Sequence, residues 1–221
     1  GRDQIRASLT RSYKAPNLGT LLARPVRNAQ YPNRTDENTA LAPDRIGNPL
    51  LAPELATGLD IAYENYLANG GLVSIGLFHR RLTDVVRNTL TQRTVSWADV
   101  PRWVSEPQNF SDATTSGLEF EAKGSAADLL PKAVAGMLPN ARALNLRASV
   151  NLYRSKVAAA PGPDNRLDGQ QPWSTTLGFD QRIAGLPLTV GGSLSLNPAY
   201  DTQLTLDQTL QRSRTHTVDL Y

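Results

Sequence analysis

Apolar and polar residues alternate along several stretches of this chain. In residues 144–152 the apolar side chains fall at even positions, from Leu144 to Leu152, and polar side chains such as Asn145 and Arg147 separate them. Because a β-strand directs successive side chains to opposite faces, this period of two predicts a strand with one apolar and one polar face. Strands are predicted in this way at residues 3–13, 55–67, 115–124, 142–156, 172–184, 187–197 and 213–221, with a more uniformly apolar strand at 71–87.

The length of these runs favours a membrane protein. Strands of soluble proteins average roughly 5–6 residues, whereas a strand that crosses a bilayer needs about 9–11. Most of the runs reach the longer length, so we expect an all-β fold, an antiparallel up-and-down transmembrane β-barrel segment of about eight strands. A soluble secreted β-sandwich that acts as a binding or adhesion module is the alternative, because its strands also alternate.

The connections between the predicted strands alternate between long and short. Residues 14–54, 88–114, 157–171 and 198–212 form long connections, whereas residues 68–70 and 185–186 form tight turns. Outer-membrane barrels have short periplasmic turns and long extracellular loops. The connection 125–141 falls on the short side but is long, so either it holds a periplasmic insertion or the strands have other bounds there. A short helical turn around residues 127–134 is an alternative that two prolines and a glycine disfavour.

Composition excludes several classes of protein. The chain has 40% hydrophobic residues but no run of 18 apolar ones, which argues against a transmembrane helix. A net charge of +3 over 221 residues gives little support for nucleic-acid binding. The absence of cysteine excludes disulfides and thiolate sites, and no secretory signal is present.

Catalytic chemistry is not expected. The chain has two histidines, His79 and His216, and both fall in predicted strands, where a structural role at the membrane interface is the simpler interpretation. Glu119 and Glu121 share the polar face of one strand, where carboxylates more often meet arginines than perform acid–base chemistry. We therefore predict no catalytic residues, no cofactor and no metal site, since no ligand cluster of suitable spacing occurs.

Several motifs, in order, resemble a known family. Residues 6–22 read RASLTRSYKAPNLGTLL, with an aromatic-basic-Ala-Pro motif at the end of a predicted strand. Residues 48–54 read NPLLAPE, residues 78–81 read FHRR at the end of the next strand, and residues 116–119 read SGLE. Together these motifs resemble the barrel of the TonB-dependent outer-membrane receptors, over most of the chain.

The resemblance implies that the chain is part of a larger structure. Transporters of this class have 22-stranded barrels with a plugged lumen. Residues 1–221 are therefore expected to form a partial barrel domain, with the plug domain and the terminal strands absent from it. Tyr221 is out of phase with Val218 and Leu220, which argues against a natural barrel end. A complete small eight-stranded outer-membrane barrel is a further alternative.

The resemblance also implies a function, namely TonB-dependent uptake of an iron chelate, most simply a ferric siderophore, across the bacterial outer membrane. The expected partners are the chelate, outer-membrane lipid and the TonB complex, reached through the absent plug. Arginines beside aromatic rings in the long loops suit a flat anionic ligand. The candidate ligand-binding residues are Arg24, Arg27, Tyr31, Arg34, Arg93, Trp97, Arg102 and Trp103.

Two other interpretations bear on these loop residues. The arginines could instead pair with lipopolysaccharide phosphates or with the loop acids Asp36, Glu37 and Asp99. Haem receptors of the family carry a histidine between the two motifs, and residues 17–47 contain none, so haem uptake is disfavoured, although Tyr31 could in principle bind iron.

Overall fold

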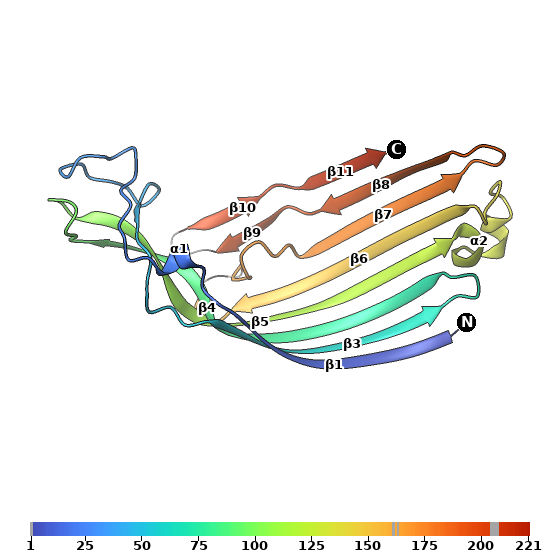
Figure 1. Cartoon of the computed structure of the whole chain (residues 1–221), viewed down its shortest axis with the longest axis horizontal. Helices are drawn as coiled ribbons and strands as arrows, with labels where there is room; N and C mark the ends of the chain where they lie inside the picture. Colours follow the sequence, from blue (N-terminus) through green and yellow to red (C-terminus); the bar gives the residue numbers. More distant parts are fainter. Residues whose placement is uncertain (1, 161, 163, 204–207) are drawn as a thin grey trace.

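The computed structural model describes residues 2–160, 162, 164–203 and 208–221. Its main sheet is an antiparallel meander in the order β1-β3-β4-β5-β6-β7-β8-β11. These strands are β1 (Arg2–Lys14), β3 (Glu54–Tyr66), β4 (Leu72–Arg93), β5 (Arg102–Ser125), β6 (Leu144–Val157), β7 (Trp173–Arg182), β8 (Thr189–Asn197) and β11 (Thr215–Leu220). All eight predicted strands are therefore present. Figure 1 shows them side by side along the long axis of the molecule.

Shorter elements lie at the two ends of the sheet. β2 (Asp44–Arg45) pairs in parallel with β5, and β9 (Tyr200–Gln203) pairs with β10 (Thr209–Arg212) in a separate hairpin. This hairpin lies in the predicted long connection 198–212, of which residues 204–207 are outside the described part of the chain. The one-turn helix α1 (Leu18–Leu21) lies at the long-loop end, opposite α2 (Ala126–Leu129) and the tight turns (Figure 1).

The pairing register collects apolar side chains on one face of the sheet. One row across five strands consists of Ile5, Tyr63, Ile75, Phe120 and Val150. Leu177 continues the face on β7, and its side chain is 44% exposed. The described strands pack no second sheet against this face, so the soluble β-sandwich is not the fold of this chain.

The opposite face is polar. Glu121 forms an ion pair at 3.1 Å with Lys123 of the same strand, and Glu119 is paired across the strands with Asn151. Neither glutamate meets an arginine within the described residues. Tyr221 lies on this face, where its hydroxyl donates to Asp180 Oδ1 at 2.6 Å. Its side chain is therefore out of phase with Val218 and Leu220, as predicted.

The predicted loop 88–114 is largely strand. β4 continues to Arg93 and β5 begins at Arg102, so residues 94–101 are the connection. A bulge between Leu82 and Val85, with Asp84 at a φ of 59°, redirects the two strands into a long arm. Pro107 lies where β5 extends beyond its pairing with β6, and such edge positions tolerate proline.

The connection 125–141 on the short-turn side is an insertion, and it contains helical turns that its prolines and glycine disfavoured. α2 and α3 (Lys132–Ala135) flank Pro131, and the Ser125 hydroxyl and the Asn69 amide both donate to the Asp128 carboxylate at 2.6 Å. Within the described ranges, no helix has the length and apolar character needed to cross a membrane.

The main sheet is open. β1 pairs with β3 and β11 pairs with β8, and the two outer strands do not pair with each other. The complete eight-stranded barrel considered from the sequence therefore does not form in this chain.

Candidate functional site

A buried ion pair attaches the connection 15–53 to the β4–β5 arm. The Asp44 carboxylate accepts hydrogen bonds from Arg102 Nε at 3.0 Å and from the Trp97 indole N–H at 2.7 Å. The side chains of Asp44 and Arg102 are both 0% exposed. Arg102 also donates to the carbonyl oxygens of Tyr31, at 3.0 Å, and of Asp36. One guanidinium thus connects three points of this connection to the arm.

The surroundings of Asp44 keep it ionised. Burial acts to raise the pKa of this carboxyl, but the hydrogen bonds from Arg102, from the Asn28 backbone N–H and from Trp97 outweigh it and lower the pKa below its usual value. The pKa of Arg102 is raised, chiefly by its hydrogen bond to Asp44. The pair is therefore charged at neutral pH.

Two asparagines extend this attachment along the arm. The Asn38 side chain donates to the Trp103 carbonyl at 2.8 Å and accepts from the Trp103 N–H at 2.7 Å. Asn48 donates to the Pro107 carbonyl at 3.1 Å. The connection 15–53 is consequently a structured cover on the arm.

A second buried arginine holds the connection 158–172 over the polar face. Arg87 donates to the carbonyl oxygens of Gln203 at 3.2 Å and of Arg166 at 3.0 Å, and it forms an ion pair with Asp168. The Gln170 amide donates to the hydroxyl of Thr115, a residue on the polar face, at 2.8 Å. These contacts place the connection above one end of the polar face.

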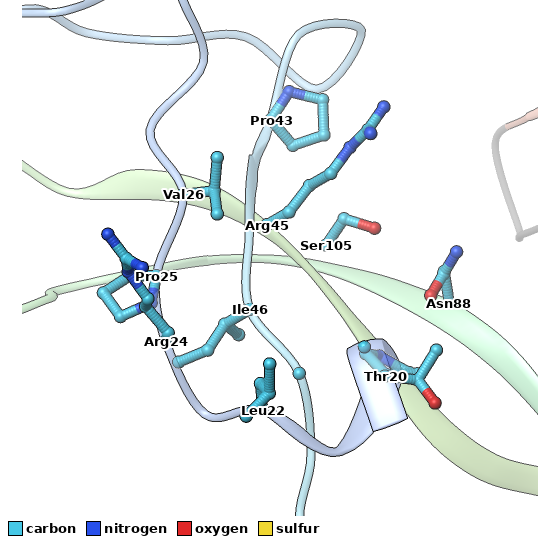
Figure 2. A pocket seen from close by; sticks show the side chains of 13 residues that line it. Thr20, Leu22, Arg24, Pro25, Val26, Pro43, Arg45, Ile46, Asn88 and Ser105 are labelled. Carbon is cyan, nitrogen blue, oxygen red and sulfur yellow. The ribbon is translucent and has the colours of Figure 1, made fainter. Parts of the chain in front are cut away.

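A surface pocket of about 680 Å³ lies between the connection 15–53 and the arm (Figure 2). Arg24 and Arg45 line it from the connection, and Asn88 and Ser105 line it from β4 and β5. Both arginines are exposed, and neither guanidinium has a hydrogen-bond or ion-pair partner within the described residues. A second pocket of about 600 Å³ shares Pro43, Asn88 and Ser105 with the first. The two pockets therefore adjoin.

The candidate residues predicted from the sequence all lie in or beside this loop layer, but only Arg24 lines one of these two pockets. Trp97 and Arg102 hold Asp44, as described above. Arg34 pairs with Asp99 at 2.8 Å and Arg93 pairs with Glu106 at 2.9 Å.

The other three candidates also take part in local contacts. Arg27 donates to the Pro32 carbonyl at 2.7 Å, and Tyr31 and Trp103 contribute the backbone groups named above. Sequence reasoning left Arg45, Asn88 and Ser105 out of the candidate set. Arg45 belonged to the same group of loop arginines, whereas Asn88 and Ser105 carry no distinctive signal.

The two histidines lie far apart in the sheet, and the pockets of the loop layer offer exposed arginines for binding. His79 Nδ1 is hydrogen-bonded to the Ser116 hydroxyl at 2.7 Å, and His216 lies on β11, which four strands separate from β4 in the sheet order. No group of three or more potential metal-ligating side chains occurs among the residues whose positions are described.

Comparison with solved structures gives matches to outer-membrane receptors. A mutant of the ferric enterobactin receptor PfeA from Pseudomonas aeruginosa is 15% identical with a TM-score of 0.63, and it matches 99% of this chain over 30% of its own length. The siderophore receptor PirA from Acinetobacter baumannii is 11% identical with a TM-score of 0.61, over 99% of this chain and 32% of its own. The FrpB iron transporter from Neisseria meningitidis is 13% identical with a TM-score of 0.57, over 99% and 29%.

These structural matches show the fold, and this chain spans about 30% of the length of the first receptor. No significant match was found among curated proteins. A family-level sequence match, to the TonB dependent receptor-like β-barrel, extends over residues 3–221. The chain therefore belongs to the TonB-dependent receptor β-barrel family.

Proposed function

We propose that this chain forms part of the wall and the outer loop layer of a TonB-dependent importer in the bacterial outer membrane. The observation that carries the proposal is the register of the sheet, which gives eight strands one apolar face toward lipid and one polar face toward a wet interior. Energy would come from the TonB complex acting on a plug, and the chain itself would perform no reaction.

The cargo that we propose is an iron chelate, with a ferric siderophore preferred over cobalamin, a sugar or another metal complex. Receptors for ferric enterobactin are among the similar structures, one of them solved with enterobactin bound. Arg24 and Arg45 support an anionic cargo, because both line one pocket and neither guanidinium has a partner within the described residues. Guanidinium groups bind anionic oxygens through paired, charge-assisted hydrogen bonds.

We revise the set of candidate ligand-binding residues according to which arginines are buried and which are exposed. Arg102 is buried and its donors are occupied, so we assign it to holding the connection 15–53 in place. Arg24 and Arg45 are exposed and unpaired within the described part of the chain, and they become the principal candidates for contact with the chelate.

Ligand binding by the protein as its gene encodes it tests this proposal. With ferric enterobactin and a ferric hydroxamate as probes, we expect the unaltered protein to bind one of them. The double variant Arg24→Gln/Arg45→Gln should then bind that probe at least about 10- to 100-fold more weakly, since the loss of even one charged hydrogen bond, worth roughly 1.5–3 kcal/mol, has that effect.

The matched control is Lys132→Gln/Arg142→Gln, which removes the same charge at the short-turn end and should leave binding unchanged. Equal affinity of all three proteins for the bound probe would refute the assignment of Arg24 and Arg45. Failure of the unaltered protein to bind or import either iron chelate would refute siderophore uptake.

A further inference from the structure

Basic side chains form a row on the apolar face, at the long-loop end. In the register, Arg11 pairs with Thr57, Thr57 with Arg81, Arg81 with Thr114, and Thr114 with Lys156. Three cations from β1, β4 and β6 therefore lie in line across five adjacent strands. Arg154 and His79 occupy the next row toward the apolar residues, on either side of Ser116.

These side chains belong to the apolar face by phase. Arg11 follows Ile5, Ala7 and Leu9 at alternate positions of β1, and the other basic residues follow apolar neighbours in the same way. Arg11, Arg154 and Lys156 are exposed and have no hydrogen-bond or ion-pair partner among the described residues. Arg81 pairs with Asp112 at 3.1 Å, but both side chains remain about half or more exposed, at 68% and 49%.

The distribution of charge on this face is one-sided. As far as the bulge, the apolar-phase positions of the eight main strands contain no lysine or arginine other than Arg11, Arg81, Arg154 and Lys156. At the opposite, short-turn end the same face carries uncharged or acidic residues, including Asp3, Asn65 and Gln181. If the cations of the apolar face served only solubility, they would be found at both of its ends.

We infer that this row binds the phosphate groups of the phosphorylated glycolipid in the outer leaflet of the outer membrane. The inference rests on the membrane orientation in the proposed function, which places the long-loop end outside. Long basic side chains at the edge of an apolar face reach the lipid headgroups with their charged ends, and guanidinium forks match phosphate oxygens. Cations on every second strand are separated by roughly 10 Å, which suits a lipid with several phosphates.

The position of these cations favours the glycolipid of the outer leaflet over other anionic ligands. A phospholipid of the inner leaflet would meet the short-turn end of the face, which lacks these cations. A soluble anion would have no reason to select a row directly above apolar rows such as Leu9–Leu59 and Ala7–Ile61. The apolar rows and the basic row together present one site for a molecule with acyl chains and phosphates.

Glycolipid-dependent stabilisation of the purified protein, as its gene encodes it, provides the test. Lipopolysaccharide added in detergent should raise the unfolding temperature of the unaltered protein, whereas dephosphorylated lipopolysaccharide and inorganic phosphate should not. The variant Arg11→Gln/Arg154→Gln/Lys156→Gln should require about 100-fold more lipopolysaccharide for the same effect, because each basic residue near an anionic surface contributes about fivefold.

The control Lys132→Gln/Arg142→Gln/Arg182→Gln loses the same charge at the short-turn end and should respond like the unaltered protein. If the triple variant of the row does not fold, Arg154→Gln alone should require about fivefold more lipopolysaccharide. An unchanged response of the row variants, or an equal response to dephosphorylated lipopolysaccharide, would overturn the inference.

Chelate binding separates this inference from the proposed function. Row variants that lose the response to lipopolysaccharide but still bind the ferric siderophore probe would confirm the inference and leave the proposed function intact. A protein that binds no iron chelate but responds to lipopolysaccharide in the expected way would remove the cargo assignment alone.

Discussion

Gly117 on β5 provides the space for a large side chain on the polar face. A Cβ atom at this position would lie 2.3 Å from Cε1 of Phe78 and 2.8 Å from the Leu152 carbonyl oxygen. The Phe78 ring therefore covers the glycine, packs near Tyr153 with 6.1 Å between ring centroids, and has the Arg80 guanidinium 5.0 Å from its centroid. Aromatic side chains cover glycines on sheets in this way.

Gly117→Ala is expected to destabilise the folded protein by about 1–3 kcal/mol, because the added methyl group meets both a ring and a backbone oxygen. Gly76→Ala is the matched control, since its Cβ would have ordinary contacts, the nearest at 3.9 Å. On gels, the temperature at which the protein shifts from the migration of the folded form to that of the unfolded form should be lower for Gly117→Ala than for the unaltered protein. It should be unchanged for Gly76→Ala. Equal temperatures for the two variants would show that the ring moves aside at little cost.

Single residues also mark where sequence reasoning was limited. The faces of Leu144, Val150 and Tyr221 follow from alternation, which depends only on near neighbours along the chain. The burial of Arg102 depends on Asp44, 58 residues earlier, and no local pattern reports such a pairing. Arginines in predicted loops were therefore identified, but those that support the loop could not be distinguished from those that are free.

At the scale of elements, the pair of Asp44 and Arg102 determines whether the connection 15–53 stays on the arm. Asp44→Asn should cost about 3–5 kcal/mol, because the buried guanidinium of Arg102 loses its counter-charge. The variant should become sensitive to limited proteolysis within residues 15–53. Asp99→Asn is the control, since its ion pair with Arg34 is about half exposed and is worth only about 0–1 kcal/mol.

The dependence of this attachment on pH follows from the lowered pKa of Asp44. A carboxyl whose pKa is lower in the folded state stabilises that state above its unfolded pKa of about 3.9, and the stabilisation is lost as pH falls through the folded value. Proteolysis of residues 15–53 by a protease active over the range should therefore be equal at about pH 8 and about pH 5. Faster cleavage at the lower pH would contradict a charged, buried pair.

The β4–β5 arm is the element that the sequence described least well. Residues 88–114, which include Pro101 and Pro107, are predicted as a connection because clear alternation of apolar and polar residues is found only on either side of them. The strands persist because the Asn109 side chain donates to the Asp84 carbonyl at 2.8 Å and to the Ala52 carbonyl at 3.0 Å, which satisfies backbone at the bulge. Such support comes from segments distant in sequence, so alternation could not reveal it.

At the scale of the whole molecule, the proposed function requires that the apolar face of the sheet meets lipid and the polar face meets water. Val150 lies between Phe120 and Thr175 on the apolar face, and Ser149 lies beside Glu121 on the polar face. Val150→Arg should cost about 2–4 kcal/mol at the middle of a bilayer, whereas Ser149→Arg should cost little. The measurement is the folding yield of each variant in lipid vesicles. An equal loss of yield for the two variants would contradict the assignment of the apolar face to lipid.

The buried attachment of the connection 15–53 has a consequence for recognition by antibodies and phages. Because Asp44 fixes this segment in one arrangement, the surface that it presents depends on the fold, and in the proposed orientation it would form a conformational epitope. Arg34 and Asp99, for example, are neighbours only in the folded protein. A binder selected against the intact protein would therefore fail to recognise a linear peptide copied from residues 15–53, and immunogens should preserve the arm together with the segment that it holds.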